Sequence, residues 1–468
     1  MRRWLWAVWA VAAALPAAGQ TYDLIGQRSL NQVINLANSF GVPAALYTPV
    51  TGVRAYRMTY QVPFLGNLIT VSGAVFEPKD LDASCVLPVH IYMHGTVFER
   101  DDVPSFLNYE GTLGYLLAGI GHTVIMPDYV GLGVDNLLLH PYVHAESEAA
   151  AGAHMLAALH ASANPSGNLH DPGTLFLSGY SQGGHAAMAL HRELQTHWPQ
   201  FPVTASAPLS GPYDISGTQF PLTFTNPSYS NPSYLAYVAL AWQQVYGNLY
   251  TDLAEVFAEP YASALPGLFD GATSGNAINN ALPPTLGELM APGALEALFA
   301  DGSPFLTAAQ DNDVYAWVPE APMQLYYCTL DEQVFYQNAE VALAHMEAAG
   351  APAVTATNGG PLDHSDCAGL AIFGAALWFS GLAPACTFGT DVATASPAPA
   401  SPIASPVRGP FPLPGAPDGA DWALADLQGR TVRTGRSSTV DPTGLPTGLY
   451  LLRSELAPGA GLRFFVQE

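Results

Sequence analysis

Residues 174–184, TLFLSGYSQGG, carry the pattern on which the fold assignment depends. The first five residues are predicted to form a short apolar strand, and the residues after the turn have the apolar spacing of a helix up to Thr196. A strand, the motif G-x-S-x-G and a helix together are the context of a nucleophile elbow. This turn strains the backbone of its serine, so the flanking positions favour residues without side chains, here Gly179 and Gly183. Ser181 is therefore the candidate nucleophile.

The composition indicates a large globular protein with an acidic surface. The chain has 468 residues, of which 49% are hydrophobic and 11% charged. Its formal net charge is −24, and Lys79 is the one lysine among 14 basic residues. Nucleic acids and anionic lipid head groups are therefore not expected as partners. No C-x-x-C pair occurs, and no metal or organic cofactor is predicted.

The N-terminus has the pattern of a secretory signal peptide. Two arginines at positions 2 and 3 precede the apolar residues 4–15, and Ala17-Ala18-Gly19 offers a cleavage site. We expect residues 1–19 to be removed and the protein to be secreted or held at the cell surface. The apolar run is too short to span a bilayer, and no later stretch is expected to do so, so no stable membrane insertion is predicted.

Strands and helices then alternate over residues 20–388, as is typical of a doubly wound, mostly parallel α/β sheet. The helices expected in this sheet domain lie at 29–39, 110–119, 145–162, 184–196, 335–349 and 366–380. The strands lie at 54–63, 67–77, 86–93, 123–126, 174–178, 203–209, 322–328 and 352–357.

Residues 211–320 interrupt this alternation. They are aromatic, broken by Pro and Gly, and helical in places, at 235–247, 252–258 and 294–300. We expect them to form an inserted helical cap over the C-terminal edge of the sheet, where open α/β sheets bind ligands.

The C-terminal part of the chain has a different composition. Residues 389–412 are rich in Ala, Pro and Ser and predict a linker. Residues 413–468 show strand-like alternation broken by Gly and Pro, which predicts a small β-sandwich.

Candidates for the acid and the base follow later strands, in the order that this fold requires. Asp331 lies just beyond the strand at 322–328, whereas Glu332 is expected to face away. Asp331 could instead serve only as a helix N-cap. His364 is the one histidine in the loop after the next strand and could take the Ser181 proton and return it to the leaving group. Structural roles are expected for His122, His140, His144 and His185.

An oxyanion needs backbone donors near the nucleophile. The N–H of Gln182, directly after the serine, is the first candidate. The second is the N–H of Thr96 in the loop His94-Gly95-Thr96 after the first buried strand, with Val97 as the alternative.

Four cysteines in an exported chain allow two disulfides. A Cys328–Cys367 bond would tie the acid loop to the base loop, and Cys85–Cys386 would clip a strand to the end of the domain. Spacing alone leaves other pairings open.

The motifs GYSQGG, PDYVGLG followed by HPYVHAESEA, and LDEQV with LDHSDC make residues 25–385 resemble the α/β-hydrolase superfamily. More narrowly, they resemble the secretory lipases and their bacterial esterase relatives. The resemblance implies a Ser-Asp-His triad of Ser181, Asp331 and His364 and a cap that lines an acyl-chain site. Lipid esters, shorter acyl esters and plant-derived esters all stay open as substrates.

The tail, with WALADLQGRTVRTGR, VDPTGLPTGLYLLR and RFFVQE, is similar to the C-terminal sorting domains of type IX secretion. This resemblance implies the type IX secretion machinery as a partner. An accessory binding module is the alternative.

Three functions are compatible with these features. The leading prediction is a secreted serine carboxylic-ester hydrolase, a lipase or esterase, acting on a small-molecule or lipid ester through an acyl-enzyme. A serine peptidase of the same fold is the second, but no charged anchor for a peptide terminus is evident. A non-catalytic surface-binding protein is the third, and the presence of all three triad residue types argues against it.

Overall fold

The computed structural model describes residues 21–383, apart from residues 41, 43–46, 48–50, 82–84, 136–137, 163–164 and 227–228. Towards the C-terminus it describes residues 409–412, 421–425, 431–446, 448–454 and 462–466. The predicted signal peptide and most of the predicted linker lie outside these residues.

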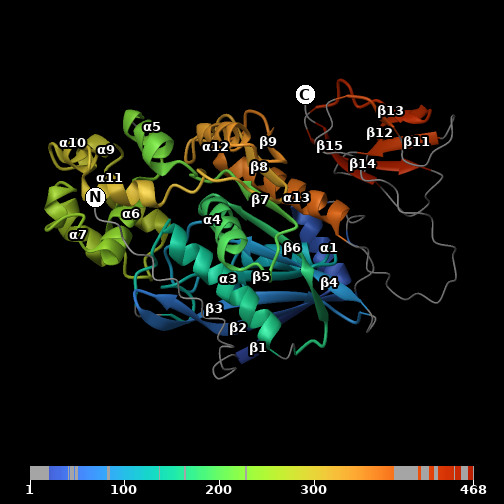
Figure 1. The fold of residues 1–468 in the computed structure, drawn as a ribbon, viewed down its shortest axis with the longest axis horizontal. Coiled ribbons are helices and arrows are strands. Elements are labelled where there is room, and N and C mark those ends of the chain that lie inside the picture. Colours follow the sequence, from blue (N-terminus) through green and yellow to red (C-terminus); the bar gives the residue numbers. More distant parts are fainter. Residues whose placement is uncertain are drawn as a thin grey trace.

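A nine-stranded sheet with the order β1-β2-β3-β5-β4-β6-β7-β8-β9 forms the centre of the protein (Figure 1). Strands β1, β2 and β3 pair antiparallel, β3 is antiparallel to β5, and the strands from β5 to β9 are parallel. The strands are β1 Thr21–Ser29, β2 Gly52–Phe64, β3 Asn67–Pro78, β4 Val86–Met93, β5 Thr123–Pro127, β6 Leu169–Tyr180, β7 Ala205–Leu209, β8 Met323–Tyr327 and β9 Val354–Asn358. The prediction of a mostly parallel α/β sheet is thus confirmed.

Helices cover both faces of the sheet. They are α1 Leu30–Ser39, α2 Gly111–Ala118, α3 Ala145–Ala161, α4 Gln182–His197, α12 Gln337–Ala348 and α13 His364–Leu382. Buried side chains of α1, α2 and α13 share one core with the sheet, while α3 and α4 pack into a second core. The strands between these two layers are buried on both faces, which explains the nearly continuous apolar run Val86–Met93.

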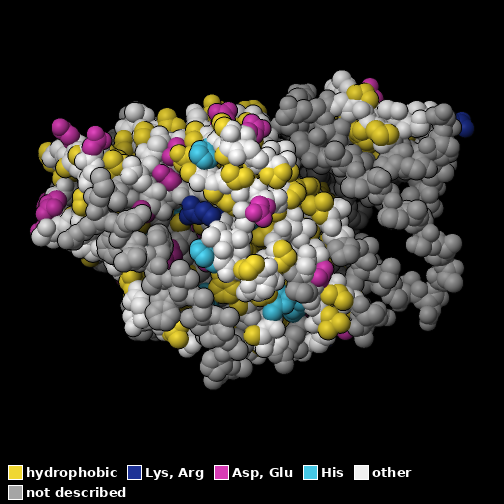
Figure 2. All heavy atoms as spheres, viewed as in Figure 1, with side chains coloured by type: hydrophobic (Ala, Val, Ile, Leu, Met, Phe, Trp, Pro, Cys, Tyr) yellow, Lys and Arg dark blue, Asp and Glu magenta, His cyan; other side chains and the backbone are white. Residues whose placement is uncertain are grey.

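Between β7 and β8 the chain forms a group of short helices with a core of its own. They are η3 Ile215–Gln219, α5 Phe220–Thr225, α6 Pro232–Tyr246, η4 Leu253–Glu255, α7 Tyr261–Leu268, α8 Gly275–Ala281, α9 Leu286–Leu289, α10 Ala294–Leu298 and α11 Pro304–Asp311. The helix predicted at 252–258 is reduced to the single turn η4. Figure 2 shows acidic side chains at the end of the molecule where these helices lie.

Helix α13 differs from the sequence expectation in two ways. It begins at His364 rather than after it, because the Asp363 carboxylate accepts the Asp366 N–H at 2.8 Å and caps the helix there. It is also long and apolar enough to cross a membrane, so the expectation that no such stretch follows the signal peptide was wrong. Half of that apolar window is buried within the protein, and the helix belongs to the core of the sheet domain.

The C-terminal residues form antiparallel sheets. Four strands pair in the order β12-β11-β14-β15, and β10 pairs with β13. The strands are β10 Phe411–Pro412, β11 Asp421–Ala425, β12 Thr431–Arg436, β13 Thr439–Val440, β14 Gly448–Ser454 and β15 Leu462–Val466.

Candidate active site

The turn between β6 and α4 has the geometry that its sequence predicts. Ser181 has φ 61° and ψ −123°, a strained conformation for a residue with a side chain. A Cβ at Gly183 would overlap the Met93 carbonyl, and one at Gly179 would overlap the Gly183 carbonyl. The chain can therefore make this turn against the end of β4 only with glycine at both positions.

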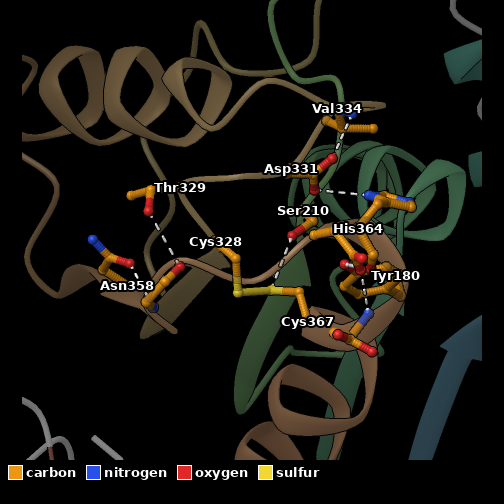
Figure 3. The surroundings of a disulfide bond; sticks show 12 residues. Tyr180, Ser210, Cys328, Thr329, Asp331, Val334, Asn358, His364 and Cys367 are labelled. Carbon is orange, nitrogen blue, oxygen red and sulfur yellow. Dashed lines mark hydrogen bonds and ion pairs between the residues drawn. A yellow bond between two sulfur atoms is a disulfide. The ribbon is translucent and has the colours of Figure 1, made fainter. Parts of the chain in front are cut away.

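Asp331 and His364 meet beyond the ends of β8 and β9 (Figure 3). His364 Nδ1 lies 2.7 Å from Asp331 Oδ2, and the two side chains are almost completely buried. The other oxygen of Asp331 accepts the backbone N–H groups of Gln333 at 3.0 Å and Val334 at 2.8 Å. These bonds fix the carboxylate, and the carboxylate in turn fixes Nδ1 as the protonated nitrogen, which leaves Nε2 as a base.

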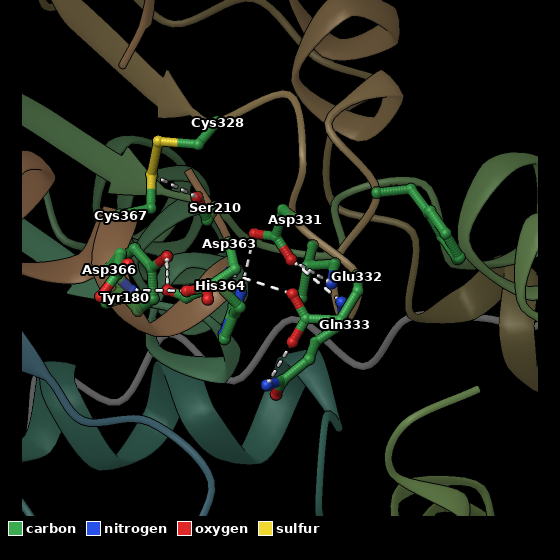
Figure 4. A network of polar contacts seen from close by, with 12 residues as sticks. Tyr180, Ser210, Cys328, Asp331, Glu332, Gln333, Asp363, His364, Asp366 and Cys367 are labelled. Carbon is green, nitrogen blue, oxygen red and sulfur yellow. Dashed lines mark hydrogen bonds and ion pairs between the residues drawn. A yellow bond between two sulfur atoms is a disulfide. The ribbon is translucent and has the colours of Figure 1, made fainter. Parts of the chain in front are cut away.

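From the sequence, Glu332 was expected to face away from the site, and this expectation was wrong. Its carboxylate accepts the backbone N–H of His364 at 3.2 Å (Figure 4). It therefore contacts the backbone of the same histidine that Asp331 contacts through the ring. Glu332 supports the position of the histidine, whereas Asp331 sets its tautomer.

The predicted nucleophile and base lie at the same edge of the sheet. The Tyr180 hydroxyl, directly before Ser181, donates to the His364 carbonyl oxygen at 2.6 Å, and the two rings are 4.9 Å apart. Among the described residues, no hydrogen bond joins the Ser181 hydroxyl to His364. The structure thus brings Asp331 and His364 into direct contact and places Ser181 one residue from a tyrosine that holds His364.

The predicted oxyanion donors flank the elbow. Gln182 is the first residue of α4, so its N–H points out of the helix N-terminus. The loop after β4 lies against the turn, because a Cβ at Gly95 would come within 3.6 Å of the Tyr180 carbonyl. Within the described part of the chain, the Thr96 N–H has no hydrogen-bond acceptor, and the Thr96 hydroxyl lies 2.9 Å from that of Tyr142.

A mainly apolar cavity opens beside Ser181. The cap supplies most of its wall, and the elbow, the acid loop and the segment before α3 supply the rest. Its lining is Tyr142, Val143, Ser181, Gln182, Pro212, Ile215, Gln219, Phe220, Thr223, Tyr229, Tyr234, Leu235, Val238, Trp242, Gln333 and Val334. Burial raises the pKa of Tyr142 and Tyr229 well above 10, so their hydroxyls stay neutral.

Comparisons with solved structures show which fold this arrangement belongs to. A hydrolase of unassigned activity from Legionella pneumophila superposes with a TM-score of 0.70 at 28% identity, over 77% of this chain and 96% of that one. The rice cell wall degrading esterase LipA from Xanthomonas oryzae gives 0.67 at 25%, over 77% and 95%. The chain has the α/β-hydrolase fold.

Candida antarctica lipase A in its closed state shares this α/β-hydrolase fold more distantly. Its TM-score is 0.54 at 15% identity, over 80% of this chain and 86% of the lipase. No family model matches the chain, and no curated protein matches its sequence.

A buried polar network lies behind the elbow of this α/β-hydrolase fold, and the sequence did not reveal it. Gln182 Nε2 lies 2.8 Å from both Glu148 Oε1 and His140 Nε2. Glu148 Oε2 is 2.7 Å from His185 Nδ1, and His185 Nε2 is 2.8 Å from the Asn312 carbonyl. Because that carbonyl accepts only, His185 Nε2 is the donor in this contact. The motif HPYVHAESEA, which contains two members of this network, was the available signal.

The other histidines expected to be structural are buried. His140 Nδ1 lies 2.9 Å from the Val130 carbonyl, and burial lowers the pKa of His140 to about 3. Burial likewise lowers the pKa of His122 and of His144 to about 4. These rings are therefore neutral near pH 7 and lie away from the Asp331–His364 pair.

A disulfide joins Cys328 to Cys367 beside this pair (Figure 3). Cys328 directly follows β8, and Cys367 lies in the first turn of α13. The bond therefore links the segment that carries Asp331 to the helix that begins at His364. The second predicted pair involves Cys386, which lies outside the described residues.

Proposed function

We propose that this protein is a serine carboxylic-ester hydrolase that acts through Ser181, His364 and Asp331. The observation that carries the proposal is the 2.7 Å contact between His364 Nδ1 and Asp331 Oδ2. A buried carboxylate that fixes the tautomer of a histidine near a strained serine turn is the arrangement needed to activate a hydroxyl. The esterase and lipase structures that share the fold agree with this chemistry.

In this mechanism His364 Nε2 takes the Ser181 proton as Oγ attacks the ester carbonyl carbon. The tetrahedral oxyanion accepts hydrogen bonds from the N–H groups of Gln182 and Thr96. The imidazolium, stabilised by Asp331, gives the proton to the leaving alkoxide, and an acyl-enzyme remains. A water then gives a proton to His364 and attacks the acyl carbon, and the collapse of this second intermediate returns the proton to Ser181 and releases the acid. Catalytic hydrogen bonds often tighten only with substrate bound, so we expect the contact between Ser181 and His364 to form then.

The cavity beside Ser181 favours an ester with an apolar acyl group. Aromatic and aliphatic side chains of the cap, among them Phe220 and Trp242, form its wall. Among the described residues, no charged side chain lines it, which suits an acyl chain better than the terminus of a peptide. Among the similar structures, one is described as an esterase that degrades rice cell walls and another as a lipase, so plant-derived and lipid esters are both candidate substrates.

The test compares Ser181→Ala with Ser178→Ala. Ser178 lies on β6, three residues before Ser181, and its hydroxyl contacts the buried His90 ring at 2.7 Å. We expect Ser181→Ala to lower kcat on p-nitrophenyl esters by more than roughly 10⁴-fold, and Ser178→Ala to stay near wild type. Aminoacyl p-nitroanilides run in parallel test the peptidase alternative. Wild-type ester turnover by the folded Ser181→Ala protein would refute the proposal, and cleavage of the anilides alone would favour a peptidase.

We also propose that the protein is exported and that residues 413–468 address it to type IX secretion. The support is the leader pattern at residues 1–19 and the tail motifs. Expression with and without the tail in a bacterium that has this machinery is the test. We expect the full chain outside the cell and the shortened chain in the periplasm. Equal release of both forms would contradict the proposed role of the tail.

A further inference from the structure

We propose that Glu110 is a positioning residue for the oxyanion hole, which holds the Gly95 N–H and so directs the Thr96 N–H towards the substrate. The inference rests on the proposed ester hydrolase function. It assigns a role to a carboxylate that the triad does not use.

Hydrogen bonds hold three backbone groups of the loop before Thr96: the Gly95 N–H and the carbonyl groups of His94 and Gly95. The Gly95 N–H lies 3.0 and 3.1 Å from the two carboxylate oxygens of Glu110. The His94 carbonyl accepts the Tyr129 hydroxyl at 2.9 Å, and the Gly95 carbonyl lies 2.8 Å from His94 Nδ1. The next donor along the chain is the Thr96 N–H, which has no acceptor within the described residues. The loop thus presents the Thr96 N–H as a free donor next to the held Gly95, and within the described residues the Val97 N–H that follows it also has no acceptor.

Glu110 does not perform the usual role of a residue at its position. It stands at the N-cap of α2, but its side chain makes no capping hydrogen bond to that helix. The carboxylate points instead to the loop after β4, fifteen residues earlier in the chain. A helix start would be served as well by Ser or Asp, so capping does not account for this glutamate.

The environment of the carboxylate also argues against a simple stabilising role. Part of the residue reaches the surface, but burial of the carboxylate raises the pKa of Glu110 to about 7. The titratable groups around it are the hydroxyls of Tyr92 and Tyr129 and the Asp102 carboxylate, and none of them supplies positive charge. In the described part of the chain, no Lys or Arg forms an ion pair with Glu110. A buried acid without a cation destabilises a protein. The hydrogen bond from Gly95 to Glu110 is therefore better explained by positioning of the loop than by a contribution to stability.

Two conservative variants separate the effect of the length of the Glu110 side chain from the effect of its charge. Glu110→Gln keeps a side-chain oxygen at the same distance but removes the charge. Glu110→Asp keeps the charge but shortens the side chain by about 1.5 Å, so the carboxylate no longer reaches the Gly95 N–H. If Glu110 acts by positioning, the Gln variant is active and the Asp and Ala variants are impaired.

The experiment measures kcat and KM on p-nitrophenyl butyrate and the inhibition constant of an alkyl boronic acid, which mimics the tetrahedral intermediate. For Glu110→Ala and Glu110→Asp we expect kcat to fall roughly 10- to 100-fold, less than the loss of a whole oxyanion donor. The boronic acid should bind weaker by a similar factor, while KM changes by less than about three-fold, because only transition-state stabilisation is lost. Glu110→Gln should stay within about five-fold of wild type.

Two controls keep the outcomes distinct. Asp102→Asn removes a nearby exposed carboxylate and should leave kcat unchanged. Ser181→Ala reports on the proposed function itself, since activity in that variant would refute the triad and not the role of Glu110. Wild-type kcat in Glu110→Asp, or a Gln variant as impaired as Ala, would overturn the positioning role. If Glu110→Ala does not fold, the comparison of Glu110→Asp with Glu110→Gln still tests the positioning role.

Discussion

The Cys328–Cys367 disulfide predicts a measurable separation between stability and activity. The bond closes a loop with a sequence separation of 39 residues. Cross-linking a loop of this length restricts the unfolded chain by about 13 cal/mol/K, which is about 4 kcal/mol at 25 °C. We therefore expect Cys328→Ala/Cys367→Ala to lower the free energy of unfolding by about 4 kcal/mol.

The single variants provide an internal check of this magnitude. Either substitution opens the same loop, so each single variant should lose about as much stability as the double variant. Urea unfolding followed by tryptophan fluorescence measures all three against the wild type. If the losses of the two single variants add up in the double variant, packing of the two sulfurs and not loop closure accounts for the stabilisation.

Activity should respond much less than stability at 25 °C. His364 keeps three other contacts in the absence of the bond: its ring to Asp331, its N–H to Glu332 and its carbonyl to the Tyr180 hydroxyl. We expect kcat of the double variant to fall by less than about 10-fold. A folded double variant with kcat lowered by 10³-fold, or with a stability loss below about 1 kcal/mol, would refute the reasoning.

Two further predictions concern the acid and the buried histidines. Asp331→Asn should lower kcat by roughly 10³- to 10⁴-fold with little change in KM, because Nδ1 of His364 loses its acceptor; Glu332→Gln, as the matched control, should stay within about 10-fold of wild type. Burial lowers the pKa of His122 to about 4 and that of His191 to about 3, so between pH 6.5 and 4 the unfolded chain binds more protons than the folded one. The free energy of unfolding should therefore fall as the pH falls through this range, by about 1 kcal/mol per pH unit for each such histidine. Urea titrations should show a shallower slope in His122→Leu, and an unchanged slope would contradict the assignment.

The sequence predicted those strands whose own residues show a clear hydrophobic pattern. The nearly continuous apolar run Val86–Met93 matches β4, since a strand buried on both faces needs no polar side. By contrast, β1 was missed, because six of the nine residues in Thr21–Ser29 are exposed or polar and no alternating apolar face is present. The strand is held by its antiparallel backbone pairing with β2, which the pattern of its side chains does not indicate.

The environment of Glu332 and of Glu110 could not be predicted in the same way. Each is a glutamate near a helix start, a common and uninformative position in a sequence. Their partners are the backbone N–H groups of His364 and Gly95, 32 and 15 residues away in the chain. Nothing in the residues around either glutamate specifies which distant backbone group it will meet.

The sequence by itself determined the elbow, because a serine between two glycines at the junction of a strand and a helix restricts the backbone locally. It also determined the alternation that builds the sheet. Only the tertiary structure decided that Asp331 and His364 touch, that Glu110 reaches Gly95 and that cap residues line the cavity beside Ser181. These contacts join segments that are distant in the chain, and the order of the strands, set by packing of the whole sheet, brings them to one edge.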